Sequence, residues 1–168
     1  EKYVAEDQRT IVERQKAAVL ADGGVWVEPE ERARMEQEEA DRKAEEERRR
    51  AAEEAKKAEK IDEMKRLEST VSAAKEQVNR ILRGDGYGDW AGFDSYKLKQ
   101  VDPSIDTKPE PAATAISKRF SPQSEIEKID AALASLQAEI YRIDERTSKF
   151  AAAKRIYDAK ELESRKER

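Results

Sequence analysis

The chain of 168 residues is 43% charged and 6% aromatic, and its 34 basic and 38 acidic residues give a net charge of −4. Because a globular domain of this length is typically about 25% charged, the composition argues against a single compact core and favours long exposed helices or coiled coils. The sequence contains no cysteine and no histidine, which excludes disulfides, thiol nucleophiles, the usual zinc sites and the side chain most used for acid–base catalysis at neutral pH.

The first predicted element is a short amphipathic helix within residues 1–22, beginning near Lys2. It should end at Gly23-Gly24, because glycine readily adopts the left-handed conformation found at helix ends. Residues 23–28 then form a connector. Its Trp26 is a candidate contact for a partner protein, with the chain's own helices as the alternative.

The composition of residues 29–60 predicts a charged helix that is exposed to solvent. Met35 is the only large apolar residue after Pro29, so no apolar stripe is available for burial. Glutamates instead precede basic residues by four positions, an order that stabilises isolated helices by roughly 0.2–0.5 kcal/mol per pair. The stretch from Glu30 to Lys60 holds 12 acidic and 10 basic residues, which argues against a nucleic-acid partner, because binding phosphate requires a basic face.

Two segments carry the alternating 3-4 spacing of a coiled-coil seam: residues 61–82, which continue the charged helix, and residues 124–168. The predicted seam residues are Met64, Leu67, Val71, Val78 and Ile81 in the first segment, and Ile126, Ile129, Leu133, Leu136, Ile140, Ile143 and Phe150 in the second. Ser124 and Glu127 match a capping box at the start of the second helix. The linker is long enough for the two segments to fold back antiparallel. The spacing leaves open whether they pair with each other, with a second copy or with a partner helix.

The linker, residues 83–123, begins with glycines and aromatic residues and continues as a Pro-rich stretch. Its rings, Tyr87, Trp90, Phe93 and Tyr96, recur every three residues. Aromatic side chains on a flexible segment are typical of docking sites, so we expect them to contact a partner protein, and Trp90 most of all. The alternative is that they fold back and cap the end of the chain's own helices. The glycines should let the backbone turn sharply off the long helix.

Together these patterns predict an all-α, elongated protein. It should bind other proteins through helix pairing and through the aromatic linker, and it could also form a homo-oligomer. No apolar run approaches the ~20 residues of a membrane span, and no motif indicates a catalytic site or a cofactor. The function most in keeping with the sequence is a non-enzymatic scaffold that spans and anchors within a large assembly. A cytoplasmic assembly of the cytoskeletal, filament-associated or axonemal kind is expected first. The alternatives are a virion or phage structural component, and a regulatory adaptor whose aromatic linker is a ligand for a folded domain.

Overall fold

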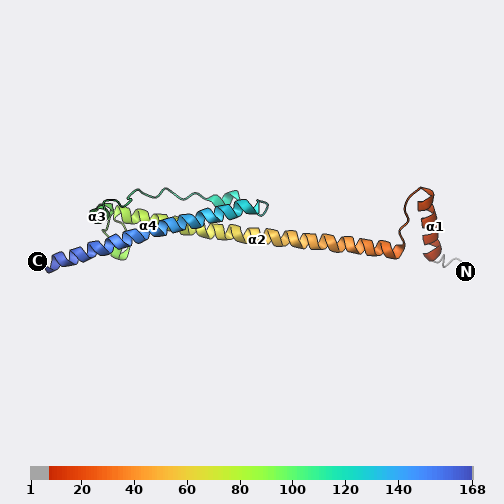
Figure 1. The fold of residues 1–168 in the computed structure, drawn as a ribbon, viewed down its shortest axis with the longest axis horizontal. Coiled ribbons are helices and arrows are strands. Elements are labelled where there is room, and N and C mark those ends of the chain that lie inside the picture. The colour runs from red at the N-terminus through yellow and green to blue at the C-terminus, as the bar shows by residue number, and fades with distance from the viewer. Residues whose placement is uncertain (1–7, 168) are drawn as a thin grey trace. The chain divides into compact units, whose positions relative to one another are not determined.

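The computed structural model describes residues 8–167, and within them it contains α-helices and short 3-10 helices but no strand (Figure 1). The elements in chain order are α1 (Gln8–Ala21), α2 (Pro29–Arg83), η1 (Gly88–Trp90), α3 (Ser95–Val101), η2 (Ile116–Arg119) and α4 (Ile126–Lys166). The predicted all-α fold is confirmed. The expected helix start near Lys2 lies outside the described residues. The chain divides into two compact units, Glu1–Ala52 and Glu53–Arg168.

In the first unit, α1 ends at the two glycines, as the sequence predicted. Gly23 has a φ of 78°, its N–H donates to the carbonyl of Leu20 at 3.2 Å, and the N–H of Gly24 donates to the carbonyl of Val19 at 3.0 Å. This pair of bonds is a Schellman motif, which satisfies carbonyls that the helix leaves free. The connector then leads into α2.

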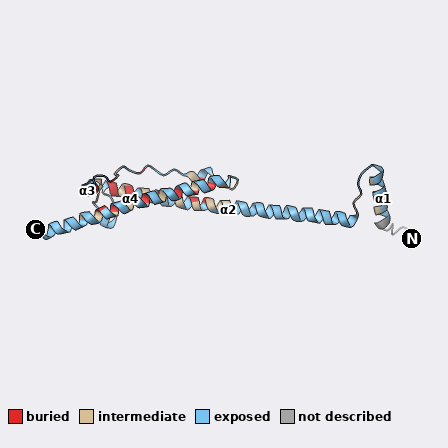
Figure 2. Ribbon diagram, in the orientation of Figure 1, coloured by how far each residue is buried: buried red, intermediate tan, exposed pale blue. Residues whose placement is uncertain are grey.

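The charged part of α2 is exposed as expected. Every residue from Glu30 to Lys56 is exposed, and burial begins only towards Lys60 (Figure 2). Pairs four residues apart line this stretch, for example Glu39 with Lys43 at 3.5 Å and Glu46 with Arg50 at 3.2 Å. Each pair contributes little, but together they favour a helix that has nothing to pack against.

In the second unit, the C-terminal part of α2 and α4 lie side by side and run in the same direction (Figure 1). Lys60 pairs with Asp130 at 2.6 Å and Lys75 with Glu139 at 3.7 Å, so higher residue numbers on α2 meet higher numbers on α4. The two segments therefore pair with each other, but not in the antiparallel arrangement that the length of the linker would allow. The chain achieves a parallel pair because residues 102–125, called the strap below, run back along both helices before α4 begins.

The strap can make this return because its sequence favours extended backbone. Residues 106–115 contain no helix, and at about 3.3 Å per residue they span roughly 33 Å. That matches the roughly 32 Å between residues 61 and 82 of a helix. Pro109 and Pro111 each bias the preceding residue towards extended conformations.

The predicted seam forms the core of the second unit (Figure 2). Buried seam residues are Met64, Val71, Val78, Ile81, Ile129, Leu133, Leu136, Ile143 and Phe150, and half-buried ones are Leu67, Ile126 and Ile140. A pair of helices alone buries little, so a further element is needed to complete the core. The chain's own linker supplies Phe93, Leu98 and Ile105, which are all buried.

The start of α4 differs from the predicted capping box. The helix begins at Ile126, and Glu125, which precedes it, makes no side-chain cap hydrogen bond. The hydroxyl of Ser124 instead accepts a hydrogen bond from the N–H of Ser121 at 3.0 Å. The serine therefore stabilises the turn before the helix, because its hydroxyl is used within that turn.

Candidate functional site

Residues 83–96, called the aromatic cap below, leave α2 through a second Schellman motif. Gly84 has a φ of 83°, its N–H donates to the carbonyl of Ile81 at 3.1 Å, and the N–H of Asp85 donates to the carbonyl of Arg80 at 2.8 Å. A residue with a side chain would be strained at this φ. The sharp turn expected from the glycines is present at this position.

The glycines of the cap serve two different purposes. Gly88 and Gly92 also have positive φ, at 60° and 77°. Gly86 does not, but a Cβ built there would lie 2.6 Å from the Cβ of Trp90. Gly86 is thus required by the close approach of Trp90 and not by its own backbone angle.

Two of the four rings pack onto the chain's own core. Phe93 is 3% exposed and makes edge contacts with Trp90 at 6.0 Å and with Tyr157 of α4 at 5.4 Å between ring centroids. Trp90 is half-buried against the same core. The prediction of a partner contact is therefore corrected for Phe93, which the chain itself covers. For these two rings the structure matches the alternative of a cap over the helix ends.

The other two rings are exposed. Tyr87 is 74% exposed and Tyr96 is 70% exposed, and the guanidinium of Arg80 lies 4.4 Å from the ring centroid of Tyr87. A groove of about 430 Å³ lies beside Tyr87, between the cap and α2. Its lining includes Ala73, Gln77, Arg80, Ile81, Tyr87 and Trp90. This groove, with an aromatic wall and apolar side chains of α2, is the best candidate for a docking site in the cap.

Trp26 lies in the first unit and is half-buried. The guanidinium of Arg32 lies 4.9 Å from the centroid of its ring, and its indole Nε1 is buried without a hydrogen-bond partner among the described residues. The neighbouring Val25 is 87% exposed. Trp26 thus packs partly on its own connector and helix start, and the predicted partner contact stays a prediction.

The most heavily bonded residue of the second unit is Glu110 of the strap, which sequence analysis did not single out. Its backbone N–H donates to Oδ1 of Asn79 on α2 at 2.7 Å, and its carbonyl accepts from Nδ2 of Asn79 at 3.0 Å. Its carboxylate accepts two bonds of 2.8 Å from Arg142 and one of 3.0 Å from Arg146, both on α4. One residue therefore ties the strap to both helices.

Arg146 completes this buried network. It is 9% exposed, and it also donates to the backbone carbonyls of Asp106 and Lys108 at 2.8 and 2.6 Å. The hydrogen bonds from Arg142, and then those from Arg146, lower the pKa of Glu110 to about 2 despite its burial. The same pairing raises the pKa of Arg142, so both groups are charged across the ordinary pH range.

A second tie lies nearer the start of α4. The carboxylate of Glu68 on α2 accepts a hydrogen bond from the N–H of Ser117 at 2.5 Å and another from its hydroxyl at 2.6 Å. Ser117 is buried. The buried polar groups of this unit therefore hold the strap in place through partners within the chain, although Nε of Arg146 has no hydrogen-bond partner among the described residues. The available sequence signals were Glu110 between two prolines, and an arginine, Arg146, within an apolar seam.

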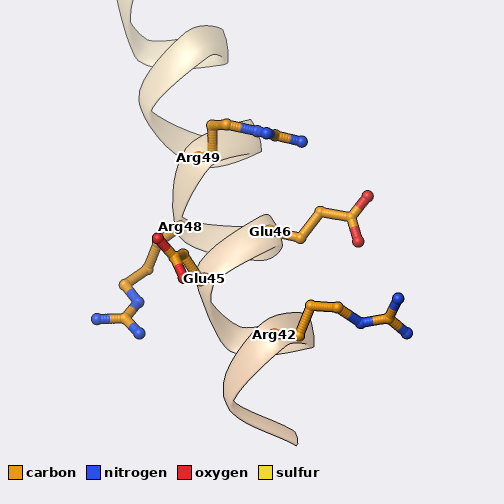
Figure 3. A pocket seen from close by; sticks show the side chains of 5 residues that line it. All are labelled: Arg42, Glu45, Glu46, Arg48 and Arg49. Atoms are coloured by element: carbon orange, nitrogen blue, oxygen red, sulfur yellow. The ribbon is translucent and has the colours of Figure 1, made fainter. Parts of the chain in front are cut away.

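The arginine-rich part of the charged helix forms no comparable site. Figure 3 shows Arg42, Glu46 and Arg49 extending to one side of the helix, while Arg48 extends to the other. The space between them is lined by side chains of a single exposed helix. Since no second element closes it, this hollow has no wall that could enclose a ligand.

Within residues 8–167 no cluster of acidic side chains has the geometry to hold a metal ion, and none of the helices there has an apolar stretch long enough to cross a bilayer. Models of known protein families, curated protein sequences and solved structures all gave no match to this chain. A function must therefore be argued from the chain's own residues.

Proposed function

We propose that the chain is a non-enzymatic structural component of a larger assembly, in which the second unit is an attachment module and the charged helix is a solvated spacer. The observation that carries this proposal is that Glu30 to Lys56 are all exposed. A helix with no apolar face gains nothing by packing, so its use lies in its length and stiffness. At 1.5 Å per residue this stretch measures about 40 Å.

The attachment role rests on how the second unit uses its side chains. Its seam is covered by its own strap and cap, and its buried charges are paired with one another. Within the aromatic cap, the groove beside Tyr87 and the exposed ring of Tyr96 remain available to a partner. A cytoskeletal or other filament assembly is the first candidate, because such assemblies use helical spacers of this composition.

The adaptor alternative has less support. It requires the linker to act as a peptide ligand, whereas Phe93 and Ile105 of that segment are buried in the chain's own core. A folded domain that captured the linker would have to pull these residues out of the core first. Binding of an isolated linker peptide to a single folded domain would favour the adaptor.

The spacer role is tested by deleting residues 36–53. These 18 residues make five turns at 3.6 residues per turn, so the deletion shortens the helix by about 27 Å and preserves its rotational phase. The tagged full chain, produced at its natural level in the source cells, should sediment with large particles or filaments. The deleted chain should fold but lose this association or shorten the particle spacing.

A matched control replaces residues 36–53 with Glu-Ala-Ala-Ala-Lys repeats of equal length, which form a helix of unrelated sequence. The replacement should restore association, because a spacer is defined by its length. If the deletion abolishes association and the replacement fails to restore it, a partner reads the sequence of this stretch and the spacer proposal is wrong. If the full-length chain sediments by itself, with no other protein attached even after cross-linking in cells, it is not a component of a larger assembly and the proposed function is wrong.

A further inference from the structure

Helix α4 has a second face with regular spacing, opposite the one that it buries. Its residues are separated alternately by three and four positions: Ala131, Ala134, Ala138, Tyr141, Glu145, Ser148, Ala152, Arg155, Ala159 and Leu162. Every one of them is exposed. We call this set the outer face. At 100° per residue it is centred about 180° from the buried set around Ile143 and Phe150, so α2 lies on the other side of the helix. At the edges of the outer face, Glu145 also borders a hollow shared with the strap, and Leu162 borders one shared with the aromatic cap.

The outer face carries groups that the chain leaves unused. Tyr141 is 71% exposed and Leu162 is 56% exposed, and Ile156, beside the face, is 48% exposed. Glu145 and Arg155 form no ion pair or hydrogen bond with any other described residue. The face otherwise consists of small residues, five alanines and Ser148, which would let another helix approach closely around Tyr141 and Leu162.

We propose that a second copy of this chain packs against the outer face, with the two α4 helices antiparallel about a two-fold axis level with residue 150. In that register Glu145 of each copy faces Arg155 of the other. Tyr141 faces Ala159, and Leu162 faces Ala138. Each large side chain thus meets a small one and each charge meets its opposite, which is the self-complementarity that a two-fold interface requires.

Other arrangements of the same face pair its residues badly. A parallel pair places Glu145 against Glu145 and Arg155 against Arg155, and like charges face to face destabilise an interface. Shifting the antiparallel pair by one heptad sets Glu145 opposite Ser148 and Arg155 opposite Ala138. Both charges then lose their partners at the interface. The unshifted antiparallel register alone satisfies charge and size together.

The area that the two helices could bury indicates how strong this contact is. The overlap between residues 138 and 162 is about 36 Å long, and a helix is about 10 Å wide, so the two copies would bury roughly 700 Å² in total. Stable complexes bury at least about 1,200 Å². We therefore expect a weak dimer that is populated at high protein concentration, or where an assembly holds the copies close together.

Charge exchange tests the partner and the register together. The full chain is measured by sedimentation velocity up to about 1 mM, alongside Glu145→Arg, Arg155→Glu and the double variant. Each single variant places like charges opposite each other twice in the dimer and should weaken association about tenfold or more. The double variant restores opposite charges and should return to the level of the natural chain. Glu161→Arg, an equal charge change about 180° from the outer face, should have a smaller effect.

Engineered cysteines test the register, because the chain has none of its own. Under mild oxidation, a mixture of Ser148→Cys and Ala152→Cys chains should form a mixed disulfide faster than either chain links to itself. Replacing the second variant with Ala134→Cys should slow this reaction. Faster self-linking of Ser148→Cys would indicate a parallel pair and overturn the proposal. So would a chain that stays monomeric throughout the concentration range, or a double variant no better than the single ones.

Discussion

Replacing Glu110 with glutamine should destabilise the second unit, because it removes the charge that holds the strap. Glutamine keeps the size of the side chain but loses the carboxylate that accepts three hydrogen bonds from Arg142 and Arg146. The side chain of Arg142 is 48% exposed and keeps Glu139 as a partner. Arg146 is 9% exposed and loses its buried counter-charge. The cost therefore falls mainly on Arg146.

Removing one partner of a buried ion pair typically costs about 3–5 kcal/mol. Arg146 would retain two backbone carbonyls and the exposed carboxylate of Asp106 at 3.7 Å. We therefore expect the lower end of this range, about 3 kcal/mol of unfolding free energy at pH 7. Changing Arg146 to methionine as well should recover much of the loss, because no unpaired buried charge is then left.

The lowered pKa of Glu110 predicts how this stabilisation depends on pH. The pKa of Glu110 is about 2 in the folded chain against an ordinary value of 4.5. Above pH 4.5 the carboxylate is charged in both states and its full stabilisation is present. As the pH falls from 4.5 towards 2, the unfolded chain takes up a proton that the folded chain does not, and the stabilisation is lost. A difference of this size corresponds to about 3 kcal/mol, so the natural and glutamine chains should converge in stability over this range.

The assay is urea unfolding of the full chain followed by the fluorescence of Trp90. A Trp26→Phe background leaves Trp90 as the only tryptophan, so the signal reports on the second unit. Glu139→Gln is the matched control: it removes a more exposed carboxylate bonded to the same Arg142, and it should cost less than about 1 kcal/mol. A cost of Glu110→Gln under about 0.5 kcal/mol at pH 7, or an equal cost at pH 3, would mean that the carboxylate of Glu110 does not hold the strap through its charge.

Three further outcomes follow from the fold. Gly86→Ala should displace the ring of Trp90 and shift its emission, because the new Cβ would lie 2.6 Å from the Cβ of Trp90; unchanged emission would contradict the close approach. Phe93→Ala should lower the unfolding free energy by about 3–5 kcal/mol in the same urea assay, since it empties a buried site, and a loss below 1 kcal/mol would return this ring to the partner-docking role. Spin labels on Glu36→Cys and Ala52→Cys should give a narrow distance distribution near 24 Å before allowance for the label linkers, and a broad one would mean that the charged stretch is not a stable helix.

The sequence predicted the helices and their buried faces, because periodic apolar spacing fixes which side of a helix is covered. It did not predict their direction. A 3-4 repeat reads alike in both directions, so the seam around Val78 and Ile143 carries no information on parallel or antiparallel pairing. That information lies in Glu110 and its partners, whose contacts join positions 31 to 36 residues apart.

The aromatic cap shows the same limit for the candidate site. The rings recur every three residues, and this equal spacing gives no indication of which rings are buried and which are exposed. The backbone turns at Gly88 and Gly92 then send Phe93 into the core and leave Tyr87 in solvent. Local spacing could identify the cluster of rings. It could not show which rings are buried, because that depends on which of them α4 covers. The short helix α3 was missed for a related reason: its signal is the single capping side chain of Asp94, which accepts from the N–H of Lys97.

The parallel pairing also determines the order in which the parts of the second unit can fold during synthesis on the ribosome. Lys60 meets Asp130, a residue 70 positions later, so the apolar seam of α2 is complete on the ribosome long before its cover exists. The strap emerges next, but Glu110 finds its arginines only when Arg142 and Arg146 have followed. The second unit therefore cannot close until α4 has been synthesised past residue 146. During that interval the seam of α2 is open to other nascent chains, and distant contacts of this kind form slowly.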